Sequence, residues 1–476
     1  MTPEKPITGG IIGAGNRGKD VYGKYALLHP EEIKIVAVAE PDSYRLKEIS
    51  RDHKIPLTNQ FKSWEDFFQK PKLCDTVFIC TQDQMHIQPA LKAIELGYDI
   101  LLEKPMAVTP TDCSFLVESA NKNKRQLRIA HVLRYNNFFQ TIYSLIQSGR
   151  LGDIITIDHR ENVSYYHYAH SFIRGNWSQE KKSSPMILAK SCHDLDILYW
   201  LVASQGGYPK KISSFGSLRH FHRGNAPPNA PERCTDGCPV ENSCKYYAPR
   251  LYISIIPLLH VAQKGGKGMT KVIANLVINH PLLFSHLKNI IPPFKKVENY
   301  EGWPVNTITD DFSCKGRWDA LCSGPYGKCV YQTSNDVVDH QVTIIEFSNQ
   351  TTATFTMHGF SYTEGRTIRI DGTKATLLGE ALDYGNTIKL FDHLTGKEEL
   401  ILHTKMNIET ESGHGGGDYL LMKSFIKSIR EKSTTEPLTS AQESLESHMM
   451  AFAAEKAREK NLVIDLEDFK SQYIRT

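Results

Sequence analysis

The sequence has no marked excess of charge of either sign and no long apolar run. Its 476 residues include 56 Lys and Arg against 53 Asp and Glu, a net charge of +3, with no long block of one sign. This balance does not predict binding to nucleic acid or to an anionic membrane surface. The longest apolar runs, such as residues 272–284, are broken by polar residues and proline. They fall short of the roughly 20 residues that a membrane span needs.

The start of the chain also lacks the pattern of a secretory signal, a basic segment followed by an apolar one. The segment MTPEKPITGGIIGAG reaches an apolar strand almost at once. We therefore expect a cytoplasmic protein without a membrane partner, whose ten cysteines are thiols or metal ligands rather than disulfides. The chain is longer than a single core of typical size, so two domains, or one domain with a large insertion, are expected.

The segment ITGGIIGAGNRG (7–18) is an apolar strand that runs into the pattern GxGxxG. The three glycines are Gly13, Gly15 and Gly18. A helix-compatible stretch follows, and a second strand, 33–40, ends in Glu40. In a dinucleotide site the glycines let the backbone approach the pyrophosphate at a helix N-terminus, and the acidic residue accepts hydrogen bonds from the ribose. Glu40 therefore favours NAD over NADP, whereas Arg45 keeps NADP possible.

Two further strands are predicted to end at the same edge of a parallel sheet, where ligands bind. The strand 75–80 is followed by Thr81, and His86 opens the next helix. The strand in 98–108 carries Glu103 and Lys104 at its end, and the following proline biases the lysine toward an extended backbone. The predicted cofactor-binding residues are Gly13, Gly15, Asn16, Arg17, Gly18, Glu40, Thr81, His86, Glu103 and Lys104.

In this order the motifs resemble the Gfo/Idh/MocA family of nicotinamide-dependent oxidoreductases. The resemblance continues through residues 128–139 and 146–158, covers about the first 215 residues and resumes near residue 337. It implies an α/β fold with an N-terminal Rossmann domain, built on a parallel sheet, over residues 1–132. Residues 133–476 would then form a substrate-binding α/β domain with an open, largely antiparallel sheet.

The sequence of the second half agrees with such a domain. Strands are predicted at 153–164 and 211–221, and 339–360 has the alternation of a hairpin around Ser348, Asn349 and Gln350. A second hairpin, 367–379, is predicted to turn at Asp371 and Gly372. The tail from about residue 417 repeats apolar residues at helical spacing.

Residues from about 224 to 336 break this pattern, and we interpret them as an insertion between two neighbouring strands. The helical middle of the insertion, 250–263 and 270–291, either caps the active site or forms a subunit contact. Six of the ten cysteines lie in it. The candidate metal ligands are Cys234, Cys238, Cys244 and Cys329.

Thiolates on short loops suit zinc or an iron–sulfur cluster. The spacing CxxxC differs from the CxxC pairs of common zinc knuckles, so reduced thiols in a loop-rich insertion are the alternative. We expect a bound metal to stabilise the insertion, a lid that has little hydrophobic core of its own, and not to take part in catalysis.

In the family, a hydride moves between a substrate carbon and the nicotinamide. The substrate proton passes to the lysine of the Glu-Lys-Pro strand end, or to an aspartate and histidine spaced four apart at a helix start. The resemblance assigns the first role to Lys104, and a lysine in a desolvated cleft can act as a base near neutrality. The alternative is a lysine that only hydrogen-bonds the cofactor or the substrate.

His193 matches the family's histidine, but Ala189 stands where the aspartate is usual, so that role cannot be carried over. Lys190, beside this position, disfavours a charged imidazolium and leaves neutral His193 as the proton acceptor. Lys190 and Lys104 would then bind hydroxyls or polarise a carbonyl. A core or capping histidine is the alternative for His193.

The neighbours of His193 have simpler interpretations. Cys192 is set aside as a nucleophile, because adjacent helical residues point about 100° apart and do not face each other. Ser191 and Asp194 match a helix-capping pattern. Asp196 is expected to bind the backbone or a neighbouring strand.

Aromatic rings combined with hydrogen-bond donors suit a sugar ring, and such residues follow the crossover into the second domain. The predicted substrate-binding residues are Arg134, Asn136, Tyr168 and Arg174. Tyr135, His170 and Trp177 belong to the same stretches, and His414 and Asp418 lie in a glycine-rich approach to the tail helices.

We expect an NAD(P)-dependent oxidoreductase, acting as a homo-oligomer on a secondary hydroxyl or ketone of a sugar, glycoside or cyclitol. An alternative is an NAD-dependent glycosidase or lyase, in which transient oxidation acidifies a C–H bond and elimination breaks the glycosidic bond. A third hypothesis is a cofactor-bound sensor without turnover.

Overall fold

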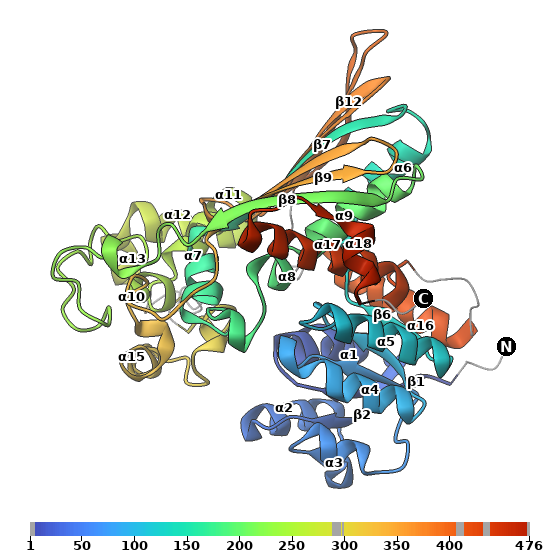
Figure 1. Cartoon of the computed structure of the whole chain (residues 1–476). Coiled ribbons are helices and arrows are strands. Elements are labelled where there is room, and N and C mark those ends of the chain that lie inside the picture. Colours follow the sequence, from blue (N-terminus) through green and yellow to red (C-terminus); the bar gives the residue numbers. More distant parts are fainter. Residues whose placement is uncertain (1–4, 288–296, 298, 406–413, 432–437, 474–476) are drawn as a thin grey trace.

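The computed structural model describes residues 5–287, 297, 299–405, 414–431 and 438–473. In Figure 1 the N-terminal domain is blue and lies below a long twisted sheet, and the insertion lies to the left. Red C-terminal helices lie between the sheet and the N-terminal domain. Over the part of the chain described here, no helix combines the length and the apolar character needed to cross a membrane.

The N-terminal domain is built on a six-stranded parallel sheet in the order β3-β2-β1-β4-β5-β6. The strands are β1 (Ile7–Ile12), β2 (Ile33–Ala39), β3 (Gln60–Phe61), β4 (Thr76–Ile79), β5 (Asp99–Leu102) and β6 (Leu127–Ile129). The intervening helices are η1 (Asn16–Gly23), α1 (Lys24–Leu28), α2 (Ser43–His53), α3 (Trp64–Phe68), α4 (Ile87–Glu95) and α5 (Pro110–Lys122). Every residue of β4 is buried, because both faces of the sheet are covered. The predicted Rossmann domain is confirmed, and the strand order reverses between β1 and β4, where ligands bind in such sheets.

The second domain carries a nine-stranded sheet in the order β14-β13-β12-β11-β7-β10-β9-β8-β15. The strands are β7 (Ile154–Ser164), β8 (Pro209–Ser217), β9 (His340–Phe347), β10 (Thr352–Ser361), β11 (Gly365–Gly372), β12 (Ala375–Leu382), β13 (Gly385–Asp392), β14 (Glu398–Lys405) and β15 (Ile464–Asp465). Only β10 and β7 pair in parallel; the other neighbours are antiparallel. The predicted largely antiparallel sheet is therefore confirmed.

Helices connect this sheet to the first domain. They are η4 (Val132–Tyr135), α6 (Asn137–Gln147), α7 (Tyr165–Tyr168), η5 (Ala169–Arg174), η6 (Glu180–Lys182), α8 (Met186–Ala189), α9 (Cys192–Ala203), α16 (Gly417–Glu431), α17 (Ala441–Lys460) and α18 (Leu466–Ser471). The tail is helical as predicted. Leu421 and Phe425 of α16 join the same buried cluster as Ile11 and Phe78 of the first domain. A C-terminal helix thus completes the N-terminal core.

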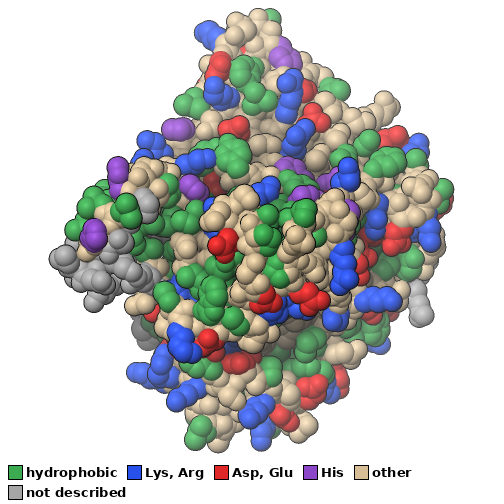
Figure 2. All heavy atoms as spheres, turned by 90° about the vertical axis from the view of Figure 1, so that its left-hand side faces the viewer, with side chains coloured by type: hydrophobic (Ala, Val, Ile, Leu, Met, Phe, Trp, Pro, Cys, Tyr) green, Lys and Arg blue, Asp and Glu red, His purple; other side chains and the backbone are tan. Residues whose placement is uncertain are grey.

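The insertion leaves the sheet after β8 and returns at β9, and these two strands pair with each other. Its helices are η7 (Arg223–Asn225), α10 (Ala248–Tyr252), α11 (Ile256–Gly265), α12 (Gly268–Asn279), α13 (Pro281–Leu287), η8 (Val305–Thr307), α15 (Cys314–Ser323) and η9 (Pro325–Gly327). The end of the predicted helical middle, 288–291, lies outside the described residues. On the face that the insertion presents, basic and acidic side chains are interspersed (Figure 2).

One predicted turn is displaced. The hairpin β9–β10 has its turn where predicted, but β11 continues through Asp371 and Gly372, and Asp371 pairs with Thr376. The turn lies at residues 373–374 instead. Gly372 is required by packing and not by a turn, since a Cβ atom there would lie 2.2 Å from the carbonyl oxygen of Leu151.

A buried bidentate ion pair joins the crossover to the second domain. Arg134 in η4 places Nε 2.7 Å and Nη2 2.8 Å from the two carboxylate oxygens of Asp196 in α9. Both side chains are 1% exposed, and Arg134 also donates to the carbonyl oxygen of Leu438. Asp196 therefore binds an arginine side chain, and the prediction that it binds the backbone or a neighbouring strand is wrong.

We expect Arg134→Ala to lower the free energy of unfolding by about 3–5 kcal/mol, because it leaves Asp196 as an unpaired buried charge. Arg369 and Asp371 offer a matched control, since their bidentate pair has similar distances but is half exposed. Arg369→Ala should cost only a small fraction of that value. Urea unfolding followed by circular dichroism tests this, and equal losses in the two variants would contradict it.

Candidate active site

A cavity of about 830 Å³ lies where the first domain, the second domain and the insertion meet. The first domain contributes Gly15, Asn16, Arg17, Arg45, Thr81, Glu103 and Lys104. The second domain contributes Asn136, His167, His170, Trp177, Lys190, His193, Glu364, Arg366, Asp383 and His414. Trp303, Thr307 and Tyr326 come from the insertion. None of these three residues belongs to the helical middle, 250–263 and 270–291, whose role as a cap or as a subunit contact stays a prediction.

The three glycines of the first turn differ in what surrounds them. Gly13 has φ 92°, and a Cβ atom there would lie 2.8 Å from the carbonyl oxygen of Cys80. A Cβ atom at Gly18 would lie 2.1 Å from the carbonyl oxygen of Gly13. At Gly15 it would meet no atom within 4 Å, although this residue lines the cavity and precedes η1. The turn thus leaves an open cradle at a helix N-terminus, which fits the pyrophosphate of a dinucleotide.

Glu40 stands at the end of β2, as expected, but both of its oxygens have backbone partners. Oε2 accepts a 2.6 Å hydrogen bond from the N–H of Ala14, and Oε1 accepts a 3.0 Å bond from the N–H of Asp42. The side chain orders the glycine turn and does not line the cavity, whereas Arg45 does. A ribose contact by Glu40 stays a prediction.

Thr81 lines the cavity, and His86 supports it from behind. The ring of His86 is buried, with Nδ1 2.6 Å from the carbonyl oxygen of Pro105 and Nε2 3.1 Å from that of Thr81. These contacts hold together the ends of β4 and β5. His86 is not part of the cavity wall, so the structure gives it a positioning role.

Arg17 joins the glycine turn to both domains. Its Nε lies 2.5 Å from Oε1 of Glu103, and its Nη2 lies 2.6 Å from Oδ1 of Asp418 in α16. Burial disfavours the charged guanidinium, but Asp418 and Glu103 outweigh it and raise the pKa of Arg17. His414 lies 3.1 Å from the other oxygen of Asp418. The glycine-rich approach to α16 is therefore part of the site.

Lys104 points across the cavity wall toward α8. Its Nζ donates a 2.6 Å hydrogen bond to the carbonyl oxygen of Ala189. A main-chain carbonyl at position 189 thus binds the lysine where the family would place an aspartate side chain. The ammonium group stays next to His193, whose pKa it lowers.

His193 is the second residue of α9, as predicted, and lines the cavity with 4% of its surface exposed. Its Nδ1 is buried without a hydrogen-bond partner. Burial, followed by the charge of Lys104 and the nearby His131 and His414, holds the pKa of His193 well below its usual range. The imidazole is therefore neutral at physiological pH and can accept a proton from a ligand.

Lys190 also lines the cavity, but two carboxylates hold it. Its Nζ lies 3.2 Å from Oε1 of Glu161 and 3.4 Å from Oε1 of Glu364. Burial opposes the charged form, yet these two carboxylates raise the pKa of Lys190. The neutral state of His193 follows from its burial and from Lys104 among other groups, more than from Lys190.

Asp194 does not cap α9. It pairs with Arg366 at 2.8 Å and lies 2.8 Å from Nε2 of His159. Burial alone would raise the pKa of Asp194, but Arg366 and His159 hold it well below its usual range. The hydroxyl of Ser191 is buried and unpartnered. The predicted capping role is wrong, because β11 supplies a buried guanidinium that needs a carboxylate.

Of the four predicted substrate-binding residues, only Asn136 lines the cavity. Arg134 is held by Asp196, and the hydroxyl of buried Tyr168 donates to the carbonyl oxygen of Val338. Arg174 donates to the carbonyl oxygens of Lys328 and Tyr246. These three side chains bind other parts of the protein in place of the expected substrate.

Sequence patterns did not reveal the residues that strands β11 to β13 bring to the cavity. They are Glu364, Arg366, Asp383 and Asn386. Burial raises the pKa of Asp383 to about 6. These residues stand at strand ends without a local motif, so only the folded sheet brings them to His193.

The four predicted metal ligands meet in a second, smaller pocket within the insertion. It is lined by Cys234, Cys238, Cys244 and Cys329, with Arg174 and Arg233 among its neighbours. All ten cysteines of the chain are free in the structure.

The cradle at Gly15 predicts a variant that folds but binds NAD poorly. We expect Gly15→Ala to keep the melting temperature, because its methyl group meets no protein atom within 4 Å. The same methyl group would obstruct the pyrophosphate and weaken NAD binding by at least about tenfold, a loss of about 1.4 kcal/mol. Calorimetric titration with NAD measures this, and Gly224→Ala in the exposed short helix η7 is the control. Unchanged affinity of Gly15→Ala would contradict the proposed cradle.

Comparison with known proteins identifies relatives along most of the chain. A Bacillus subtilis protein named "Putative oxidoreductase YteT" is 23% identical over 356 residues, which cover 73% of this chain and 71% of that protein. Inositol 2-dehydrogenase of Salmonella typhimurium is 26% identical over 199 residues, which cover 41% of this chain and only 54% of that enzyme. The crystal structure of scyllo-inositol dehydrogenase from Lactobacillus casei, with NAD(H) and scyllo-inositol, matches with a TM-score of 0.60 at 15% identity. That match covers 97% of this chain and 100% of the other, and shows a common fold.

Two family models match the two domains. The model described as "Oxidoreductase family, NAD-binding Rossmann fold" matches residues 7–131. The model described as "Oxidoreductase family, C-terminal alpha/beta domain" matches residues 143–214 and 310–466, and the break between these parts overlaps the insertion. The chain therefore belongs to the Gfo/Idh/MocA oxidoreductase family, with an NAD-binding Rossmann domain at its N-terminal end.

Proposed function

We propose that the protein is an NAD-dependent dehydrogenase that acts on a secondary hydroxyl or ketone of a sugar, glycoside or cyclitol. The observation that carries this proposal is the meeting of three features in one cavity: the glycine cradle, the ammonium of Lys104 and the neutral imidazole of His193. The family and the similarity to an inositol 2-dehydrogenase support the class of substrate.

In the oxidative direction, bound NAD supplies the acceptor for the hydride that leaves the substrate carbon. His193 takes the proton of the substrate hydroxyl, so that alcohol is converted to ketone, with one hydride and one proton removed. Lys104 donates a hydrogen bond to the same oxygen and stabilises the negative charge that develops there. In the reductive direction His193 returns the proton.

Lys190 serves substrate binding in this scheme. Glu161 and Glu364 keep its ammonium charged on the cavity wall, where it can donate hydrogen bonds to substrate hydroxyls. The amide of Asn136 lies on the same wall, although its Nδ2 already donates to the carbonyl oxygen of His414.

The remaining wall suits a polyhydroxylated ring. Trp177, Trp303 and Tyr326 provide aromatic surfaces, and Asp383 and Asn386 provide polar groups on the same cavity. Sugar rings bind by stacking their C–H faces on aromatic side chains while polar groups bind the hydroxyls. This combination supports a sugar or cyclitol over a flat apolar substrate.

The cofactor proposed is NAD, because the family model that matches residues 7–131 describes an NAD-binding fold and Glu40 places a carboxylate at the end of β2. Arg45 on the cavity wall would favour the 2′-phosphate of NADP, so parallel titrations with the two cofactors decide the preference.

We further propose that the chain forms a homo-oligomer in the cytoplasm. Phe215 and Ile344, on the paired strands β8 and β9, are 61% and 47% exposed, and Leu378 on β12 of the same sheet is 37% exposed. A second copy packed on this sheet would bury them. The ten free thiols support a reducing compartment.

A screen of sugars, glycosides and cyclitols, followed at the absorbance of reduced nicotinamide, tests the proposed activity. On an active substrate, we expect Lys104→Ala and His193→Ala each to lower kcat by about 10²–10⁴-fold, the usual range for acid–base groups. Arg369→Ala, on the exposed sheet, is the control. Unchanged turnover in both variants would contradict the site assignment.

The same screen separates the other two hypotheses. The oxidative glycosidase is the alternative because Ala189 stands in place of the family's aspartate. Release of an aglycone from a synthetic glycoside without net NADH would support that function instead. Tight NAD binding without reduction of cofactor across the whole panel would favour the sensor.

The neutral state of His193 predicts an unusual pH profile for kcat/KM. Because its pKa lies well below the ordinary value of about 6.5, the imidazole keeps its basic form as the pH falls through that value. We therefore expect no acidic limb near pH 6.5, and a constant ratio between the wild type and His193→Ala from pH 8 to about pH 6. A limb near 6.5 that disappears in His193→Ala would contradict the neutral assignment.

A further inference from the structure

Four cysteines from distant parts of the insertion converge on one pocket. Cys234, Cys238 and Cys244 belong to one loop, and Cys329 joins them from 85 or more residues later in the sequence. A short antiparallel bridge brings the two segments together: the N–H of Cys234 donates to the carbonyl oxygen of Gly327, and the N–H of Cys329 donates to that of Glu232, both at 2.8 Å. The backbone is therefore built to present the sulfur atoms to one another.

Hydrogen-bond donors are directed at these sulfur atoms. Main-chain amides of Tyr246 and Tyr331 bond the sulfurs of Cys244 and Cys329, each from two residues further along the chain. Arg174 donates to Sγ of Cys234 at 3.6 Å. Amides and a guanidinium around sulfur suit thiolates, the form in which cysteine binds metals.

The spacing of the sulfurs separates a single ion from a cluster. Around one tetrahedral zinc ion, bonds of about 2.3 Å place any two sulfurs about 3.8 Å apart. Within the described ranges, two groups of three possible ligands have all their ligand atoms within 4.8 Å, and no three of these cysteines form such a group. The two groups are His29, Glu31 and Glu32, and Glu180, Glu455 and Glu459. In any three of these cysteines at least one pair of sulfurs therefore stands farther apart than the ligands of one zinc ion.

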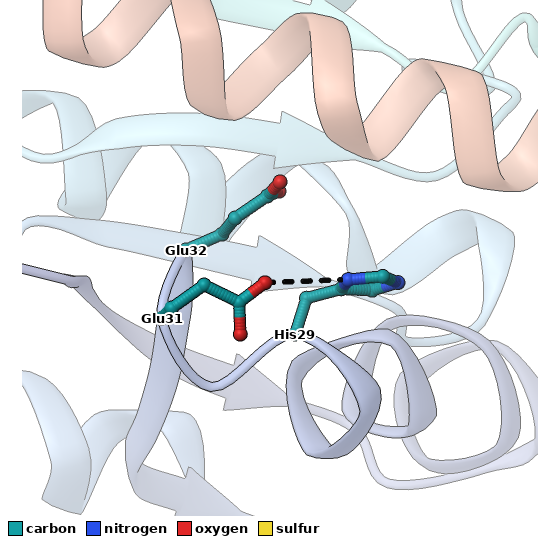
Figure 3. A group of neighbouring side chains, drawn as sticks. All are labelled: His29, Glu31 and Glu32. Carbon is teal, nitrogen blue, oxygen red and sulfur yellow. Dashed lines mark ion pairs between the residues drawn. The ribbon is translucent and has the colours of Figure 1, made fainter.

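The first of these groups shows that closeness alone is not a metal site. In Figure 3 the carboxylate of Glu31 faces His29, with which it forms an ion pair of 3.6 Å, while Glu32 points away from both. Glu32 instead accepts a hydrogen bond from the hydroxyl of Tyr25. These side chains of the turn between α1 and β2 are therefore accounted for by contacts within the protein.

We propose that Cys234, Cys238, Cys244 and Cys329 bind an iron–sulfur cluster. Such a cluster takes four cysteine thiolates and places several iron and sulfide ions between them, so its ligands stand farther apart than those of one ion. The two arginines on the pocket wall, Arg174 and Arg233, offset the negative charge of four thiolates.

The position of the cluster gives it a structural role in the proposed active site. Cys329 follows η9, which carries Tyr326 into the cavity, where its ring stacks on His170 at 4.8 Å. Arg174 ends η5, and the same helix presents His170 to the cavity. The cluster therefore fixes the wall of the cavity from behind. Among the described residues of the insertion the apolar clusters are small, and bound metal supplies folding free energy in such segments.

Metal analysis of the full chain tests the proposal independently of any enzyme activity. We expect protein purified without oxygen, or reconstituted with ferrous iron and sulfide, to contain equal molar amounts of iron and acid-labile sulfide. It should show a broad visible absorption that bleaches on reduction with dithionite. Stoichiometric zinc without sulfide would overturn the cluster in favour of a single ion. Absence of iron and sulfide after both treatments would overturn it outright.

Substitutions in the same insertion provide matched variants. Cys238→Ser and Cys329→Ser should lose most of the iron, whereas Cys322→Ser, at an exposed thiol of α15, should retain it. Equal loss in Cys322→Ser would show nonspecific iron and overturn the site.

NAD affinity should stay the same in all three variants, while KM for the substrate rises in the two that lose the cluster, because Tyr326 is released. The wild-type metal content decides the proposal even if a variant does not fold.

Discussion

Arg17 connects the parts of this protein that must stay aligned for a hydride to move between cofactor and substrate. Arg17 lies in the glycine turn, and its guanidinium forms ion pairs with Glu103 at the end of β5 and with Asp418 on α16. Asp418 in turn contacts His414, which lies beside His193. A buried charge needs its partners in place, so the cofactor edge and the substrate edge are held by one set of ion pairs.

The electrostatics of the cavity follow from a high density of buried charge. Lys190 and Arg366 are held by Glu161, Glu364 and Asp194, which leaves these cations charged and fixed. Lys104 has only a carbonyl oxygen as its partner among the interactions above, so its positive charge acts on His193. The result differs from an aspartate–histidine pair, because no carboxylate stands at position 189 to stabilise an imidazolium.

The insertion changes what the family fold encloses. It interrupts the match to the C-terminal domain, yet it supplies aromatic residues to the cavity. It also contacts η5, where Arg174 donates a hydrogen bond to Cys234 of the insertion. A segment with so little core needs an additional constraint to hold a precise wall, and four converging cysteines can provide one. Substrate selection and metal binding are thereby linked in the proposed scheme.

Local patterns in the sequence determined the Rossmann domain, the open sheet, the insertion and the residues of the glycine turn, because each depends on periodicity or on neighbours a few positions away. The resemblance to the family led to His193 and Lys104, and the structure places both on one cavity. The predicted roles of Arg134 in substrate binding and of Asp194 in helix capping are wrong. Their ion-pair partners, Asp196 and Arg366, come close only in the folded protein. Only the tertiary structure decided which charges are paired, since a carboxylate or guanidinium in the interior must find an opposite charge wherever the chain brings one.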